Sequence, residues 1–163
     1  MNIIRIDPVD IANGPGVRVV VWVAGCHHNC PGCHNPTTHD FNQGRSSESL
    51  EPIIMSLLKP EYVQGVTFSG GDPFAPENIK AVSKLSKNVK LQYPQKAIWI
   101  YTGYLYDDID KSYLQNIDVL VDGPFIESQK DITLLFRGSS NQRLIDVQQS
   151  IHQNNIILWE EHD

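Results

Sequence analysis

The sequence predicts an α/β protein in which a mostly parallel sheet is built from strands that alternate with helices. Four short runs are apolar and rich in β-branched or aromatic residues, and each ends in glycine, as buried parallel strands do. Segments with helical patterns lie between them, which implies βαβ units with right-handed crossovers. The 163 residues suit one domain, residues 1–163, and no internal repeat, low-complexity tract or linker divides them.

The strands and helices are expected in the following order. The four apolar runs predict strands over residues 18–25, 65–71, 96–103 and 117–123. A helix is expected over 49–58, after a serine-rich start that suits capping. A second helix is expected over 76–91, where Ile79, Val82, Leu85 and Val89 have helical spacing. A shorter helix over 107–115 and a last strand over 155–160, closing or bordering the sheet, complete the prediction.

Composition and charge exclude several classes of protein. The net charge of −6 disfavours a nucleic-acid partner, and the basic residues do not cluster along the sequence apart from Arg137 and Arg143. The N-terminus carries Asp7 and Asp10 and has no apolar run of a signal peptide. The longest apolar segment, residues 19–25, is too short to span a membrane. We therefore expect a cytoplasmic protein with reduced thiols and no membrane partner.

All three cysteines lie in one short stretch, "AGCHHNCPGCHN", directly after the first predicted strand. Cys26, Cys30 and Cys33 have the spacing C-x3-C-x2-C. Three thiolates on a short loop suit a 4Fe–4S cluster and leave its fourth iron without a protein ligand. An open position on a metal is where a substrate or cofactor binds.

Other uses of the cysteines remain open. Structural zinc would need one of four nearby histidines, but the second paired knuckle of a zinc finger is absent from the sequence; the histidines are His27, His28, His34 and His39. A disulfide with one spare thiol is disfavoured in a reducing compartment. A thiol-redox site at Cys30 and Cys33 would leave Cys26 unexplained.

Three further loops follow predicted strands, so we expect them at the same edge of the sheet as the cysteines. These loops are "SGGDP" at 69–73, "YTGY" at 101–104 and "DGPF" at 122–125. Asp122 either orients a ligand or caps a turn. The stretch "NGPG" at 13–16 predicts a turn or hairpin before the first strand.

Near the C-terminus, an apolar strand-like start at residue 134 leads into "RGSSNQR" at 137–143. Its arginines, Arg137 and Arg143, either grip a carboxylate or partner backbone or belong to a solvated surface loop.

The cysteine motif resembles the signature of the radical S-adenosylmethionine (SAM) enzymes. The resemblance implies a small, partial βα barrel of mostly parallel strands, with a cluster held by Cys26, Cys30 and Cys33 and SAM bound at the open iron. The "SGGDP" segment resembles the family's GGE motif, with aspartate in place of glutamate, which implies SAM contacts from Gly70, Gly71 and Asp72. Gly32 stands where the family often has an aromatic residue. Gly32, Cys33 and His34 complete the expected cofactor contacts, with His34 offering a flat face beside the nucleoside.

Taken together, the motifs are similar to those of the activating enzymes of anaerobic (class III) ribonucleotide reductase, over about residues 5–147. This implies an oxidoreductase that cleaves SAM reductively to a 5′-deoxyadenosyl radical and so generates a glycyl radical. The implied partners are the reductase large subunit and an electron donor such as a flavodoxin, and no catalytic acid or base is expected. An activase of another glycyl-radical enzyme, of the pyruvate formate-lyase type, and a non-catalytic zinc-binding module are the alternatives. The tail at 152–163 is expected either in the core or at a partner interface.

Overall fold

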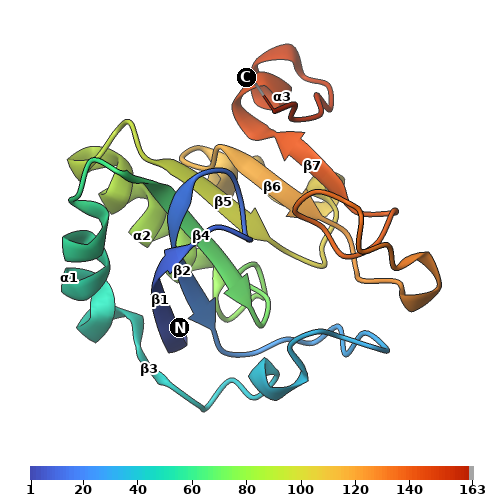
Figure 1. Ribbon diagram of the computed structural model, residues 1–163, viewed down its shortest axis with the longest axis horizontal. Helices are drawn as coiled ribbons and strands as arrows, with labels where there is room; N and C mark the ends of the chain where they lie inside the picture. Colours follow the sequence, from blue (N-terminus) through green and yellow to red (C-terminus); the bar gives the residue numbers. More distant parts are fainter. Residues whose placement is uncertain (162–163) are drawn as a thin grey trace.

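The computed structural model describes residues 1–161, in which one mixed sheet carries two long helices on one face (Figure 1). The strands are β1 (Asn2–Asp10), β2 (Val17–Val23), β3 (Arg45–Ser46), β4 (Val63–Gly70), β5 (Ala97–Tyr101), β6 (Val119–Asp122) and β7 (Arg143–Asp146). The helices are α1 (Ser47–Leu58), α2 (Ile79–Gln92) and the short α3 (Val147–Gln153). None of the described helices is both long and apolar enough to cross a lipid bilayer.

The sheet has the order β3-β1-β2-β4-β5-β6-β7. Its middle is parallel, because β2, β4, β5 and β6 pair in the same direction. The outer strands are antiparallel: β1 pairs with β2, β3 with β1, and β7 with β6. The predicted α/β class and the parallel middle are therefore confirmed, and the sheet is open, with β3 and β7 at its edges.

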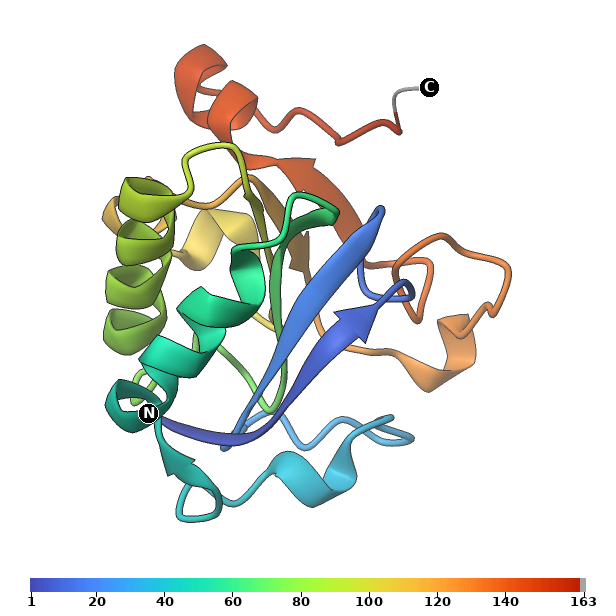
Figure 2. The same cartoon turned by 60° about the vertical axis from the view of Figure 1, so that its left-hand side comes forward.

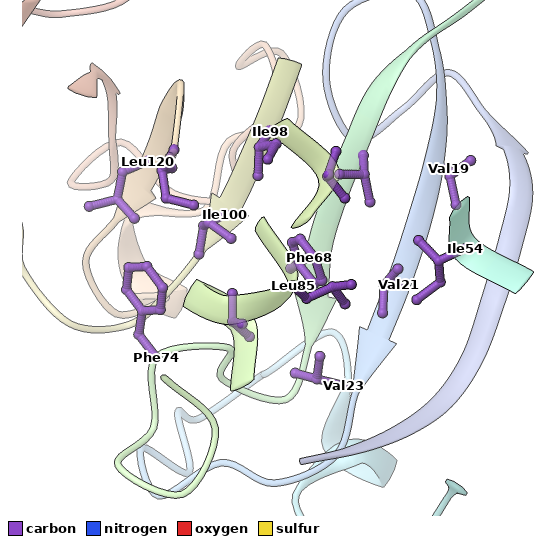
Figure 3. Close-up of a cluster of buried hydrophobic side chains, with 14 of the residues drawn as sticks. Val19, Val21, Val23, Ile54, Phe68, Phe74, Leu85, Ile98, Ile100 and Leu120 are labelled. Atoms are coloured by element: carbon purple, nitrogen blue, oxygen red, sulfur yellow. The ribbon is translucent and has the colours of Figure 1, made fainter. Parts of the chain in front are cut away.

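The main core lies between the sheet and helices α1 and α2 (Figure 3). Alternate residues of each parallel strand point to this side, as the two-residue period of a strand requires. Figure 3 shows Val21 and Phe68 from neighbouring strands meeting Ile54 of α1 and Leu85 of α2. These side chains are at most 3% exposed. Each adds roughly 1.5–3 kcal/mol of burial free energy. This packing holds the parallel strands in register and so fixes the positions of the loops that follow them.

The opposite face of the sheet contains a fully buried cation, Arg18. Its guanidinium donates to the Thr67 hydroxyl at 2.9 Å and to three backbone carbonyl oxygens, those of Pro15, Val66 and Ala97. Burial lowers the pKa of Arg18 to about 10, so the group stays charged at neutral pH. Because Pro15 lies in the "NGPG" segment, Arg18 fastens the β1–β2 connection over this face of the sheet. That segment is the predicted hairpin turn.

Two of the predicted elements have a different secondary structure from the one expected. Residues 107–115 do not form a helix but two separate 3-10 turns, Tyr106–Asp108 and Lys111–Leu114. The Asp110 carboxylate accepts from the Ser112 N–H at 2.9 Å, and this local bond competes with continuous helix formation. Residues 155–160 do not form a strand, since Leu158 makes only an isolated bridge to Ile145 of β7.

The strand-like start at residue 134 is also corrected. Phe136 has a left-handed backbone, with φ of 57°, which no strand accommodates. Its carbonyl oxygen instead accepts the Tyr101 hydroxyl at 2.6 Å. Burial raises the pKa of Tyr101, so this hydroxyl keeps its proton for the bond. The loop at 124–142 is thereby tied to the sheet on the side away from α1 and α2 (Figure 2).

The sequence analysis did not identify β1, β3, β7 or α3. β3 has only two residues. β1 contains Pro8, and its pairing with β2 is irregular between Asp7 and Asp10. β7 has only four residues and follows the polar "RGSSNQR" segment. α3 has only seven residues and begins at its N-cap, Asp146. Such short or irregular elements carry weak periodic signals.

Candidate functional site

One pocket, with a volume of about 410 Å³, brings the predicted loops together at the carboxyl ends of the parallel strands. This volume falls in the range of roughly 300–1,000 Å³ typical of ligand sites. Its lining includes residues of the cysteine loop, "SGGDP", "YTGY" and "DGPF", the four segments expected at one edge. Trp22, Ser69 and Tyr101 also line it. They alternate with the core-facing residues, so the pocket extends along the sheet face opposite α1 and α2.

The cysteine loop contains a tight turn whose residues explain its sequence. The Cys33 N–H donates to the Cys30 carbonyl oxygen at 3.1 Å, and Gly32 between them has φ of 73°. A proline followed by a residue with positive φ is the requirement of a type II turn, and Pro31-Gly32 satisfies it. Glycine at position 32 is therefore set by the turn.

Gly32 itself does not line the pocket. A Cβ added at this position would meet the Glu127 carboxyl group at about 2.9 Å, on the far side of the turn. The predicted cofactor contact through Gly32 gains no support from this placement. Cys33 and His34, its successors in the chain, do line the pocket, and the His34 ring lies 4.8 Å from the Phe125 ring, centroid to centroid.

The loop is attached to the sheet at its beginning. The Gly25 N–H donates to the Thr38 carbonyl oxygen at 2.7 Å, and the Cys26 N–H donates to that of His39 at 3.2 Å. Gly25 has φ of 99°, and the Phe41 ring occupies the space where its Cβ would stand. The chain after β2 thus folds back so that Thr38 and His39 lie beside Gly25 and Cys26. This keeps the thiols between them at the pocket wall.

The three cysteines are free thiols, each partly exposed, and all three line the pocket. Burial raises the pKa of Cys26, outweighing the backbone N–H groups of His28 and Asn29, which lower it. The Cys33 sulfur lies 3.4 Å from the Asn35 amide nitrogen and 3.5 Å from His39 Nε2. Hydrogen-bond donors near sulfur are common around iron–sulfur clusters, where they tune the reduction potential.

This donor set fits a 4Fe–4S cluster. Within residues 1–161, no three histidine, cysteine, aspartate or glutamate side chains converge on one metal-ion position. The thiolates of a cubane cluster bind different irons, so they need to face a common cavity but not a common point. A single tetrahedral zinc ion would need convergence, and the geometry gives no support to that alternative.

The glycine loop after β4 lies against the start of the cysteine loop. The Gly71 N–H donates to the Val23 carbonyl oxygen at 2.8 Å, and the Asp72 N–H donates to that of Gly25 at 2.7 Å. A Cβ on Gly71 would lie 2.4 Å from the Gly25 carbonyl oxygen. Gly70 has φ of 96°, a conformation that favours glycine. Both glycines line the pocket, as the resemblance predicted for SAM contacts, and their roles stay a prediction.

Gly71→Ala is expected to displace the cysteine loop. The new methyl group must push against the Gly25 backbone, and overpacking of this kind costs about 1–3 kcal/mol. We expect a lower melting temperature and a several-fold loss of SAM affinity, measured by equilibrium dialysis on the cluster-loaded protein. Pro76→Ala, at an exposed position in the same connection, is the control. Wild-type affinity in Gly71→Ala would show that the loop contact does not position the site.

Asp72 has a different role from that of its glycine neighbours, because protein donors surround its carboxylate. Oδ1 accepts from the Thr102 hydroxyl at 2.7 Å and the Phe74 N–H at 2.9 Å. Oδ2 accepts from the Gly103 N–H at 2.9 Å. His28 Nε2 lies 2.7 Å from Oδ2, a close ion-pair contact off the axis of the ring N–H. Asp72, only 2% exposed, thus joins the glycine, cysteine and "YTGY" loops.

His28 is therefore a structural partner within the cysteine loop. Contact with the Asp72 carboxylate raises the pKa of His28. Its ring also lies edge-on against the Tyr104 ring, with 4.5 Å between centroids. The sequence analysis treated this histidine only as a nearby zinc ligand, and nothing in the local sequence points to Asp72 as its partner.

The "RGSSNQR" segment is an ordered loop, and its two arginines have different roles: Arg143 forms a structural ion pair and Arg137 lines the pocket. Arg143 makes a bidentate ion pair with the fully buried Asp122, with Nε 3.0 Å from Oδ1. Asp122 also accepts the Tyr106 N–H at 2.9 Å. Arg143 and Asp122 thus connect β6, β7 and the β5–β6 connection that contains Tyr106, and neither lines the pocket.

Arg137 does line the pocket, and the loop around it is held by Gln142. The Gln142 side-chain oxygen accepts from the N–H groups of Gly138 and Ser139 at 3.0 and 3.1 Å. Arg137 itself donates to the Gln142 carbonyl oxygen at 2.5 Å. A guanidinium keeps further donors that a ligand carboxylate can accept from.

Pocket residues that sequence reasoning missed come from the open face of the sheet and from "NGPG". Asn13 lines the pocket, and its carbonyl oxygen accepts the Thr67 hydroxyl at 2.7 Å. Trp22 and Tyr101 line it from β2 and β5. In the sequence, Trp22 and Tyr101 alternate with buried core residues. This pattern identifies them as pocket residues only when it is known which face of the sheet the helices cover.

Comparison with known proteins gives consistent matches. A protein-family model described as "4Fe-4S single cluster domain" matches residues 12–145. An Escherichia coli K12 protein named "Anaerobic ribonucleoside-triphosphate reductase-activating protein" is 42% identical over 148 residues, covering 87% of this chain and 96% of its own. Proteins of the same name from Enterobacteria phage T4 and Vibrio cholerae are 42% and 43% identical, covering 88% and 87% of this chain and 93% and 96% of their own.

Proposed function

Because the chain belongs to the family of anaerobic ribonucleoside-triphosphate reductase-activating proteins, we propose that it activates an anaerobic ribonucleotide reductase by generating a glycyl radical on the large subunit. It is a radical-SAM oxidoreductase that uses one 4Fe–4S cluster and S-adenosylmethionine. When bound, the cluster supplies the electron that cleaves SAM to the 5′-deoxyadenosyl radical, which takes a hydrogen atom from glycine.

The observation that carries this proposal is the pocket, which combines three free thiols with glycine-loop backbone. Cys26, Cys30 and Cys33 stand on one wall, where they would hold three irons of the cluster. Gly70 and Gly71 bring backbone N–H and C=O groups to the same cavity, which suits the amino group of a bound SAM.

The other lining residues orient the cofactor and exclude water. His34 and Phe125 present rings to the pocket, which would flank the nucleoside of a bound SAM. Arg137 offers donors to a carboxylate. Asp72 positions the three loops through its four protein contacts. No side chain needs to act as acid or base, because a carbon-centred radical abstracts the hydrogen atom directly.

The open sheet suits a partial βα barrel of the radical-SAM type, with residues 1–163 as one domain. Helices α1 and α2 would be on its outside and the pocket on its inside, where residues of loop 124–142 form part of the pocket lining. Residues 162 and 163 lie outside the described residues. The reductase large subunit would cover the open side of the pocket, and an external donor such as a flavodoxin would supply the electron.

The test is electron paramagnetic resonance on anaerobically reconstituted, dithionite-reduced protein, with and without SAM. We expect a reduced 4Fe–4S signal that changes shape when SAM binds the open iron. Iron and sulfide near four each per chain are expected from the same sample. Addition of an anaerobic ribonucleotide reductase should then produce a glycyl-radical signal on the large subunit.

Two results would contradict the proposal. One stoichiometric zinc ion, without sulfide or a cluster signal, would make the cysteine loop a structural metal site. The second is SAM cleavage that forms a glycyl radical on pyruvate formate-lyase but none on ribonucleotide reductase. The chain would then be the activase of another glycyl-radical enzyme.

A further inference from the structure

The outer face of α2 carries a stripe of three lysines. Lys80, Lys84 and Lys87 are all exposed. At 3.6 residues per turn, they fall within about 60° of one another around the helix. The opposite face of α2 is buried in the core through Val82, Leu85 and Val89. The helix is therefore fixed with its lysines facing solvent.

The stripe concentrates positive charge in a chain whose net charge is −6. α2, with the sequence IKAVSKLSKNVKLQ, contains no acidic residue. Lys90 of the same helix pairs with Asp118, but within residues 1–161 none of the three stripe lysines forms an ion pair. Glu48 and Glu51 of α1, a helix packed against α2, line a groove together with Lys80 and Lys84.

The first turn of α2 is bonded to the cysteine loop. Asn78, the N-cap residue, donates from Nδ2 to the Ala24 carbonyl oxygen and to that of Asp72, both at 3.0 Å. Glu77 lies 2.8 Å from the His27 ring nitrogen. The helix that carries the stripe is therefore bonded, at its N-terminal end, to the start of the segment that carries the three cysteines.

The proposed reaction needs an electron that this chain does not store. All three cysteines of the sequence lie in one loop, so no thiols remain for a second cluster that would relay electrons. The electron must arrive from another protein at the cysteine loop. Encounters between redox proteins use small interfaces and are steered by complementary charge.

We propose that the α2 lysine stripe is the docking surface for an acidic one-electron carrier protein. This inference rests on the proposed function. In the step it serves, the carrier is oxidised by one electron and the 4Fe–4S cluster is reduced by one, with no atom transferred. From Lys80 to Lys87 the stripe extends over about 10.5 Å of helix, at 1.5 Å per residue.

The arrangement also separates the two protein partners. The pocket lies on the face of the sheet opposite α1 and α2, so the target glycine approaches from there. Figure 2 shows α2 on one side of the sheet and loop 124–142 on the other. A carrier on α2 leaves the open side of the pocket accessible to the reductase.

The test compares Lys80→Glu/Lys84→Glu/Lys87→Glu with the unchanged cluster-loaded protein. A flavodoxin in its hydroquinone form is the probe, and stopped-flow absorbance follows cluster reduction. At about 20 mM ionic strength we expect the triple variant to be reduced at least about tenfold more slowly. The difference should shrink at about 0.5 M salt, where charges are screened within a few ångströms.

Matched single variants control for net charge. Lys84→Glu and Lys59→Glu change the charge equally, but Lys59 is at the C-terminal end of α1, outside the stripe. We expect only Lys84→Glu to slow reduction and to weaken flavodoxin binding in low-salt titration calorimetry. Equal effects of the two variants, or no effect of the triple variant, would overturn the proposal.

Two further measurements separate this inference from the function on which it rests. Dithionite needs no protein docking surface, so SAM cleavage driven by dithionite should be the same in the triple variant and the unchanged protein. Failure of that cleavage in the unchanged protein would refute the function itself. Loss of reductase binding in the triple variant, with normal reduction by flavodoxin, would assign the stripe to the reductase and overturn the carrier proposal.

Discussion

Replacing Cys26, Cys30 or Cys33 singly with alanine is expected to abolish SAM cleavage while leaving the chain folded. Each thiol would hold a different iron, so no neighbour can take over the lost bond. The loop lies outside the hydrophobic core, and the three side chains are partly exposed, so their removal costs little packing energy. The measurement is 5′-deoxyadenosine formation after anaerobic reconstitution, with circular dichroism to establish the fold.

The control for the cysteine variants is His27→Ala in the same loop. The His27 side chain is 52% exposed, contacts Glu77 and does not line the pocket. It should retain cleavage near the wild-type rate. If Cys30→Ala kept full activity, with a cluster of unchanged iron content, the three-thiol assignment would be wrong.

Much of the site could be predicted because parallel strands deliver their following loops to one edge. By this rule the cysteines, Gly70 and Gly71 are predicted at one edge of the sheet, and they do line a common pocket. Pro31-Gly32 is a local pair typical of a type II turn, which the sequence analysis did not use, and it accounts for the glycine before Cys33. These inferences hold because they depend on local chemistry and on strand direction.

The remainder depends on contacts between residues distant in the sequence. Arg18 reads as a surface residue at the start of a strand, yet it is fully buried and fastens "NGPG" through Pro15. The sequence analysis gave Arg143 the same possible roles as Arg137. Arg143 instead pairs with the buried Asp122 and does not line the pocket. The lysines of α2 did not stand out as a cluster because spacings of four and three bring them together on the surface of the predicted helix and not along the sequence.

Asp72 is the second residue whose replacement should have a large effect. Asp72→Ala would leave the Thr102 hydroxyl and the N–H groups of Phe74 and Gly103 without their acceptor. Leaving one buried donor without its acceptor costs about 1–3 kcal/mol, and Asp72→Ala removes the acceptor of three donors. We expect a melting temperature lower by many degrees and no measurable SAM binding by the cluster-loaded protein. Asp107→Asn, at an exposed carboxylate, should change neither.

Conservative variants separate the positioning role of Asp72 from general stability. Asp72→Asn places an amide nitrogen, a donor, at one of the two oxygen positions. The backbone N–H of Gly103 or Phe74 would then face another donor, so Asp72→Asn should lose the contacts of one oxygen and keep those of the other. Thr102→Val removes one donor to Asp72 and the acceptor of the Tyr104 N–H, and should cost only about 1–2 kcal/mol. Similar SAM affinity in all three variants would mean that the loops hold their positions without the carboxylate.

The substitution Asp72→Glu tests why this chain has "GGD" where the family it resembles has GGE. Thr102 Oγ1 and Gly103 N stand 2.7 and 2.9 Å from the carboxylate, so there is no space for another methylene group. The longer side chain must displace either the "YTGY" loop or His28, at a cost of about 1–3 kcal/mol. We expect Asp72→Glu to fold but to bind SAM several-fold more weakly in equilibrium dialysis. If glutamate instead matched aspartate in both affinity and melting temperature, the short side chain would not be a requirement of the loop spacing.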